Sequence, residues 1–158
     1  SVTSIEDKED WFKKWSELFK YDNFEIRLRD EGEEYENAIF EDNQAYDVIV
    51  VDGKRRAWCA EAAVKALAEG GMIILDDSDR INTSEEYRRA VAALKSANLL
   101  QVDFFGFCPM NCYTKTTSLF LSRNFDFKCK NEFQPANGWG NLWSMQRRER
   151  KDFFKKLG

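Results

Sequence analysis

Acidic side chains follow three of the apolar segments in this chain. Glu6 ends the segment SVTSIE, Asp52 follows YDVIVV, and the pair Asp76-Asp77 follows MIIL. A carboxylate directly after a strand can accept hydrogen bonds from both hydroxyls of a ribose, or it can ligate a hard cation such as Mg²⁺. If the segments are parallel strands of one sheet, these acids meet at the same edge. That edge is the main candidate for a functional site.

The absence of histidine limits the catalytic mechanisms and metal sites that this chain can form. None of the 158 residues is His, which excludes Ser-His-Asp hydrolysis, Cys-His dyads and most zinc sites. The four cysteines, Cys59, Cys108, Cys112 and Cys129, are too scattered for paired CxxC metal knuckles. Any catalysis must therefore use carboxylates, Lys, Tyr, Cys or a cofactor.

The composition is that of one globular domain, with 43% hydrophobic and 33% charged residues. No apolar run is long enough to span a membrane and no signal-peptide pattern opens the chain, so we expect a cytoplasmic protein. Acidic residues outnumber basic ones by 28 to 24, and residues 1–47 hold 15 acids against 6 bases. This balance gives no reason to expect a nucleic-acid partner. The first residue is Ser rather than Met, which predicts a trimmed start or a piece of a longer chain.

The apolar periodicity predicts the strands and helices that position the acids. Strand patterns fall at residues 1–6, 24–28, 46–51, 72–75, 99–107 and 117–122, the last two forming an antiparallel pair at one edge. Helix patterns fall at residues 7–20, 57–68, 84–97 and 142–157, and residues 30–43 form an acidic loop with a short helix. Gly70-Gly71 is a stop signal for the second helix, and the run at 46–51 is typical of an interior strand covered on both faces.

The order of these elements predicts the fold class and the domain organisation. Alternating strands and helices indicate a single α/β domain over residues 1–158, built on a Rossmann-like, doubly wound and mostly parallel sheet with an antiparallel edge strand. Residues 124–158 form an aromatic tail that ends in the last helix.

Together these segments resemble the class I S-adenosylmethionine-dependent methyltransferases. The resemblance rests on SVTSIE, YDVIVVDG, a helix ending in EGG, MIILDD and TSLFLS, and it runs from the family's second strand to its last, over residues 2–123. It implies S-adenosylmethionine as the cofactor. The family's ribose-binding acid falls on Glu6, and its adenine-contacting loop falls near Asp30 and Glu31. The acid near the reacting methyl group falls on Asp52, which Gly53 follows.

The family's first strand and its glycine-rich loop have no counterpart among these residues. In the family that strand lies in the middle of the sheet, between the positions taken here by residues 2–6 and 46–51. Without it two strands have unpaired interior edges, and each unmade buried backbone hydrogen bond costs about 1–3 kcal/mol. We expect a missing amino-terminal segment, a partner chain in a homo-oligomer, or the carboxyl-terminal region to fill the position. In that last region, residues 137–141 form either a GxG loop or a plain turn.

Methyl transfer from a sulfonium is an in-line displacement that depends mainly on proximity and orientation. The lack of histidine is therefore no obstacle, and Asp52 and Lys54 are the catalytic candidates, with Lys54 or Arg55 as a base or charge stabiliser. Asp52, Asp76 and Asp77 also resemble the magnesium-binding acids of catechol-type O-methyltransferases, where the cation lowers the pKa of a substrate hydroxyl. Alternatively, Asp76 and Asp77 cap the segment that follows them.

The leading hypothesis is a methyltransferase-like protein that acts on a small-molecule or glycan-type acceptor, with neither nucleic acid nor membrane as a partner. One alternative is a non-catalytic, degenerate module of the same fold that uses its exposed sheet edge or aromatic tail for oligomerisation. Another is a different nucleotide-binding Rossmann enzyme. Arg55 and Arg56 either hold a carboxylate or phosphate of a substrate or are solvated bases. Five aromatic residues either line an acceptor pocket or pack over the sheet: Phe125, Phe127, Phe133, Trp139 and Trp143.

Overall fold

The computed structural model describes residues 1–108, 112–128 and 155. The chain divides into two compact units, residues 1–126 and 127–158, and the elements described below all belong to the first. Most of the predicted aromatic tail and nearly all of the helix predicted at 142–157 lie outside the described residues. None of the described helices combines the length and the apolar composition that crossing a membrane requires.

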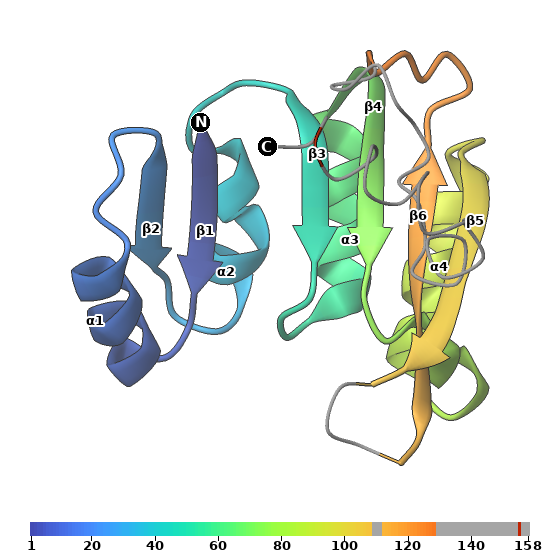
Figure 1. Ribbon diagram of the computed structural model, residues 1–158, viewed down its shortest axis with the longest axis horizontal. Helices are drawn as coiled ribbons and strands as arrows, with labels where there is room; N and C mark the ends of the chain where they lie inside the picture. Colours follow the sequence, from blue (N-terminus) through green and yellow to red (C-terminus); the bar gives the residue numbers. More distant parts are fainter. Residues whose placement is uncertain (109–111, 129–154, 156–158) are drawn as a thin grey trace. The chain divides into compact units, whose positions relative to one another are not determined.

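The described strands form two sheets. β1 (Val2–Glu6) and β2 (Phe24–Leu28) pair in parallel, and α1 (Glu9–Leu18) connects them. The second sheet has the order β3-β4-β6-β5. Its strands are β3 (Tyr46–Val51), β4 (Leu67–Leu75), β5 (Leu100–Phe107) and β6 (Thr114–Leu121). β1, β3 and β4 point the same way in Figure 1, whereas β6 runs antiparallel to both of its neighbours.

This architecture confirms the predicted α/β fold class with a mostly parallel sheet and one antiparallel strand. The antiparallel strand lies one position inside the edge, because the chain passes from β5 back into the space between β4 and β5. The acidic loop after β2 contains α2 (Glu33–Asn37) and a 3₁₀ helix at Ala38–Phe40. The short helix predicted within residues 30–43 is therefore present. A second 3₁₀ helix, Ser78–Asn82, follows β4.

The hydrophobic core lies between the four-stranded sheet and two helices. α3 (Arg56–Ala66) and α4 (Glu85–Ser96) cover one face of this sheet in Figure 1. The small side chains of α3 let it approach the sheet closely, and Ile73, Leu75 and Phe120 are completely buried beneath the helices.

Within the described residues, no helix covers the opposite face of β3. Ile49 and Val51 point into the core, but the alternating residues Val48 and Val50 are 41% and 61% exposed. The prediction that both faces of this strand are covered is therefore wrong for the part of the chain that the structure describes.

The boundary between α3 and β4 differs from the prediction. The helix ends at Ala66 and the strand runs through both glycines, so Gly70-Gly71 is not a helix stop. The register between β3 and β4 shifts here, and Gly70 adopts a φ of +78° that suits such a bulge. A Cβ on Gly71 would lie 2.8 Å from the carbonyl oxygen of Asp47. These glycines therefore serve strand packing.

Candidate functional site

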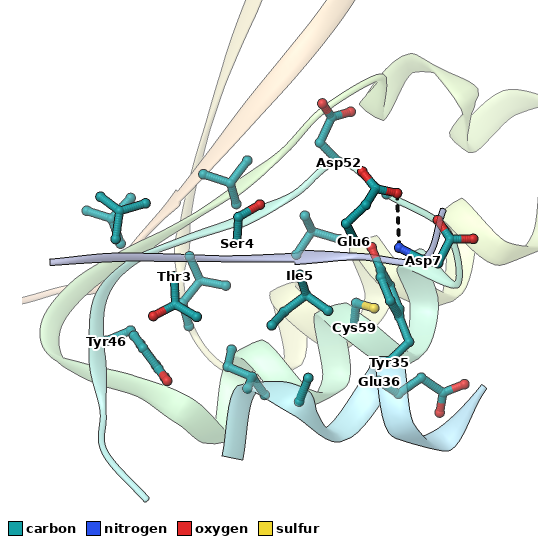
Figure 2. A pocket seen from close by; sticks show the side chains of 18 of the residues that line it. Thr3, Ser4, Ile5, Glu6, Asp7, Tyr35, Glu36, Tyr46, Asp52 and Cys59 are labelled. Carbon is teal, nitrogen blue, oxygen red and sulfur yellow. Dashed lines mark hydrogen bonds between the residues drawn. The ribbon is translucent and has the colours of Figure 1, made fainter. Parts of the chain in front are cut away.

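A cavity of about 1080 Å³ lies between β1 and β3, and both strands line it along their length. Within the described residues, no strand pairs with the facing edges of β1 and β3. We call this space the strand gap. It coincides with the position that the resemblance predicts for the family's first strand, and Figure 2 shows α2 contributing Tyr35 and Glu36 to one side.

Glu6 and Asp52 both line the strand gap. Figure 2 shows Glu6 at the end of β1 and Asp52 directly after β3, at the same end of the cavity. Oε1 of Glu6 accepts hydrogen bonds from the backbone N–H groups of Asp7 and Lys8, each over 3.0 Å. These two bonds hold the carboxylate at the turn that leads into α1. Glu6 and Asp52 thus lie at the carboxyl ends of strands from two different sheets, not of the single sheet that the sequence predicts, and they line the same cavity.

The carboxyl groups of Asp52 and Asp76 interact, and their pKa values shift in opposite directions. Burial raises the pKa of Asp52, and the hydrogen bond and negative charge of Asp76 raise it further. Burial alone would raise the pKa of Asp76 as well. The Thr117 hydroxyl, which donates to its Oδ1 over 2.6 Å, and the bond with Asp52 instead lower it. Asp52 is thus the member of the pair that takes up a proton first as the pH falls.

Arg56 ties the turns after β3 and β4 together. Its Nε donates to the carbonyl oxygen of Gly53 over 2.9 Å, and its Nη1 donates to the carbonyl oxygen of Asp76. Its Nη2 donates to the carbonyl oxygen and to Oδ1 of Asp52 over 3.0 and 3.1 Å. The buried guanidinium is therefore used internally, which makes Arg56 a structural residue of the site and not a substrate-binding base.

The structure does not support the predicted magnesium site at Asp52, Asp76 and Asp77. Asp77 has a left-handed φ of 53° and its buried carboxylate pairs with Lys115 at 2.6 Å and with Arg80 at 3.2 Å. In the described ranges, no group of three or more Cys, Asp or Glu side chains could hold a metal ion. The turn after β4 directs the Asp77 side chain toward β6, where Lys115 lies. Its charge is therefore balanced by Lys115 and Arg80.

Lys54 contacts the acids that follow the two strands of the smaller sheet, Asp7 after β1 and Glu31 after β2. Its Nζ lies 2.6 Å from Oδ2 of Asp7 and donates to Oε2 of Glu31 over 2.7 Å. The hydrogen bonds to Asp7 and Glu31 raise the pKa of Lys54 above its ordinary value, so the amine stays protonated near neutral pH. Of the two predicted roles, this favours charge stabilisation over general base.

The predicted adenine loop is placed at the surface. Asp30 and Glu31 are both exposed, and neither is among the described residues that line the cavity. Glu31 is engaged by Lys54, whereas Gly53 lines the cavity directly.

Two further side chains in the cavity were not predicted as site residues. Tyr35 packs against Gly53, and a Cβ at position 53 would collide with the Tyr35 hydroxyl. Burial raises the pKa of Tyr35 to about 12 and that of Cys59 to about 11, so both groups are neutral near pH 7. Tyr35 carried no sequence signal beyond its place in the acidic loop, because its approach to Gly53 depends on how α2 packs beside α3.

Arg55 links α2 to α3. Its guanidinium pairs with Glu36 and lies 4.2 Å from the ring centre of Trp58. The guanidinium of Arg89 lies 4.5 Å from the same ring, so the indole contacts two cations. The Arg55 guanidinium thus contacts both Glu36 and Trp58. Like Arg56, it is engaged by other residues of the protein.

Solved structures of methyltransferases share this fold. The O-methyltransferase TomG from Streptomyces achromogenes, in complex with S-adenosylmethionine, matches with a TM-score of 0.56 and 11% identity over 76% of this chain and 60% of its own. A Klebsiella pneumoniae protein assigned as an O-methyltransferase matches with a TM-score of 0.60 and 13% identity over the same shares of the two chains. Spermidine synthase from Thermotoga maritima matches with a TM-score of 0.56 and 15% identity over 78% of this chain and 47% of its own.

These likenesses define the class to which the fold belongs. The chain has the fold of the class I S-adenosylmethionine-dependent methyltransferases. It spans about 60% of the length of the two O-methyltransferase structures. No protein-family model and no curated protein matches the sequence. At identities this low the likeness establishes the fold, and the name of the spermidine synthase shows that the fold is not confined to methyl transfer.

Proposed function

We propose that this chain is part of an S-adenosylmethionine-dependent methyltransferase that acts on a small-molecule or glycan-type acceptor in the cytoplasm. The observation that carries the proposal is that two acidic residues, Glu6 and Asp52, line one cavity at the carboxyl ends of β1 and β3. Ligands of open α/β sheets bind at this end of the strands.

The residues present fit the nucleoside part of the cofactor. An ionised carboxylate only accepts hydrogen bonds, so Glu6 is suited to the two hydroxyls of a ribose. The cavity also reaches the upper end of the range of about 300–1,000 Å³ that is typical of ligand pockets. For the amino-acid part of the cofactor, Gly53 is the only glycine among the described residues that line the cavity. The backbone donors of a glycine-rich loop would come from outside this set.

S-adenosylmethionine, when bound, supplies the electrophilic methyl group. In the proposal Glu6 binds and orients the ribose, and Asp52 borders the reacting end. The protonated amine of Lys54 offsets the negative charge of the acids around it. The acceptor must approach in line with the bond that breaks, so the contribution of these residues is orientation and charge balance.

The test is thermal unfolding in the presence of S-adenosylhomocysteine. A ligand that binds only the folded state stabilises it by about 2.7 kcal/mol at a concentration of 100 times its Kd. We expect the Tm to rise with ligand concentration for the wild type and for Glu9→Ala, an exposed acid of α1. We expect no rise for Glu6→Ala. A wild type that does not respond contradicts the proposal, and a response to NAD or a sugar nucleotide instead favours another Rossmann enzyme.

The open strand gap favours a second candidate, a non-catalytic module that takes a strand from a second copy of the chain. The facing edges of β1 and β3 are unpaired in the described residues, and Val50 beside them is 61% exposed. Sedimentation equilibrium distinguishes this candidate. It requires concentration-dependent dimers that Val50→Lys weakens, whereas a monomer at every concentration excludes it.

A further inference from the structure

The strand gap leaves the two sheets without backbone pairing where the site is formed. In the part of the chain that the structure describes, no strand joins β1 to β3. Among the described residues, side-chain contacts link the carboxyl ends of these strands. Lys54 follows β3, Asp7 follows β1, and Glu31 follows β2, and all three meet through one ammonium group.

The pair between Lys54 and Asp7 is the more protected of the two contacts. The Asp7 side chain is only 11% exposed, so its charge needs a partner close by. Burial alone would raise the pKa of Asp7, but the hydrogen bond and charge of Lys54 outweigh burial and lower it. The carboxylate is therefore ionised at neutral pH, and Lys54 is the cation that holds it.

Asp7 is also connected directly to the proposed cofactor site. Its backbone N–H donates to Oε1 of Glu6 over 3.0 Å. A force that holds Asp7 near β3 thus also holds the turn that carries the Glu6 carboxylate. Because Asp52 directly follows β3 and precedes Lys54 by two residues, the same contact also holds Glu6 relative to Asp52.

We propose that Lys54 is a positioning residue of the cofactor site. Its ammonium group binds Asp7 and Glu31 and so holds the end of β1, with Glu6, opposite Asp52 across the strand gap. The inference rests on the proposed function for the identity of the ligand, whereas the contact between the sheets exists without a ligand.

Calorimetric titration with S-adenosylhomocysteine tests whether Lys54 acts through its two acids. We expect Lys54→Met to weaken binding about 5–10-fold, because it removes two charge-assisted hydrogen bonds, and Lys54→Arg to stay within about twofold of the wild type. The matched control is Lys13→Met, which breaks the exposed pair with Glu9 on α1 and should leave the Kd unchanged.

The decisive variant combines Lys54→Met with Glu31→Gln. If Lys54 works through Glu31, the double variant binds no more weakly than Lys54→Met alone. Fully additive losses would mean that Lys54 and Glu31 contact the ligand separately. Tighter binding by Glu31→Gln alone would mean that the released amine binds the ligand. Either result overturns the proposal.

Hydrogen exchange without ligand separates this inference from the proposed function. We expect the amides of Asp7 and Lys8 to exchange faster in Lys54→Met, to a lesser extent in Glu31→Gln, and at the wild-type rate in Lys54→Arg and Lys13→Met. If the wild type does not bind S-adenosylhomocysteine, the proposed function fails and this arm still tests the contact. Unchanged exchange in folded Lys54→Met and Glu31→Gln overturns the positioning role.

Discussion

The two sheets of the first unit are stabilised in different ways. The four-stranded sheet packs against α3 and α4 over a core that includes the completely buried side chains of Ile73, Leu75 and Phe120. The pair β1–β2 with α1 contains no buried residue. Since burial of apolar surface is the main source of stability, the smaller sheet has far less of it.

Ion pairs and aromatic contacts take the place of a core in the smaller sheet. Arg27 contacts Asp42 at 2.8 Å, and the ring centres of Trp15 and Phe19 lie 5.3 Å apart. Exposed ion pairs contribute about 0–1 kcal/mol each, so this region opens more easily than the four-stranded sheet. The proposed cofactor site therefore lies between a stable four-stranded sheet, which Asp52 follows, and the less stable β1–β2 sheet, which carries Glu6.

The largest expected loss of stability comes from a substitution in the four-stranded sheet. Phe120→Ala removes a completely buried ring, and we expect the free energy of unfolding to fall by about 3–5 kcal/mol in urea titrations. The matched control is Phe105→Ala on β5, whose ring is 73% exposed, with a change within about 0.5 kcal/mol. Phe24→Ala in β2 should fall between them. A loss for Phe24→Ala as large as that for Phe120→Ala would contradict the comparison.

Arg56→Met is expected to have the next largest effect. It keeps the apolar stem and removes the donors that satisfy the carbonyls of Asp52, Gly53 and Asp76, at a cost of about 2–4 kcal/mol. Arg88→Met, which breaks an exposed pair on α4, should cost less than about 0.5 kcal/mol. Equal losses in urea unfolding would show that the buried guanidinium does not join the two turns.

Gly53→Ala tests the contact between the turn after β3 and α2, which carries Tyr35. The new methyl group collides with the Tyr35 hydroxyl, so we expect a loss of about 1–3 kcal/mol in the free energy of unfolding. Tyr35→Phe removes the colliding oxygen, and the double variant should recover part of the loss. Simple additivity of the two single changes would show that Tyr35 moves away at no cost.

Asp52→Asn should have the smallest effect, and it should be stabilising. The pKa of Asp52 is raised in the folded state, so the native protein binds the proton more tightly and ionisation weakens the fold as the pH rises through that pKa. A neutral Asn avoids this cost, and we expect a gain of about 0.3–0.5 kcal/mol at pH 7. The gain should vanish near pH 3, below the unfolded value of 3.8. Urea titrations at both pH values check the sign, and a loss at pH 7 contradicts it.

The predictable parts of the fold are those set by local pattern. β2 and β3 have the predicted bounds, because short apolar runs between polar residues leave little choice of register. The end of α3 was missed because Gly70 and Gly71 are common helix stops. Only the packing of β4 against β3 shows that they permit a bulge and a close approach.

The candidate site was predictable to the extent that it follows from strand ends. Glu6 and Asp52 line the same cavity because β1 and β3 point the same way (Figure 1), so that their carboxyl ends lie at the same end of it. The pairing of Asp77 with Lys115 could not be read from the sequence, since it depends on β6 inserting beside β4. The contact of Lys54 with Asp7 depends likewise on the width of the strand gap.

The guanidinium groups of Arg55 and Arg89 lie over the indole ring of Trp58, so the fluorescence of Trp58 depends on their positions. Arg55 contacts the indole and at the same time holds Glu36 of α2, the helix that borders the strand gap. A ligand that enters the strand gap and shifts α2 would also move the Arg55 guanidinium relative to the indole ring of Trp58. The emission of Trp58 should change with it, so a variant in which Trp58 is the single tryptophan would report occupancy by fluorescence without an attached dye.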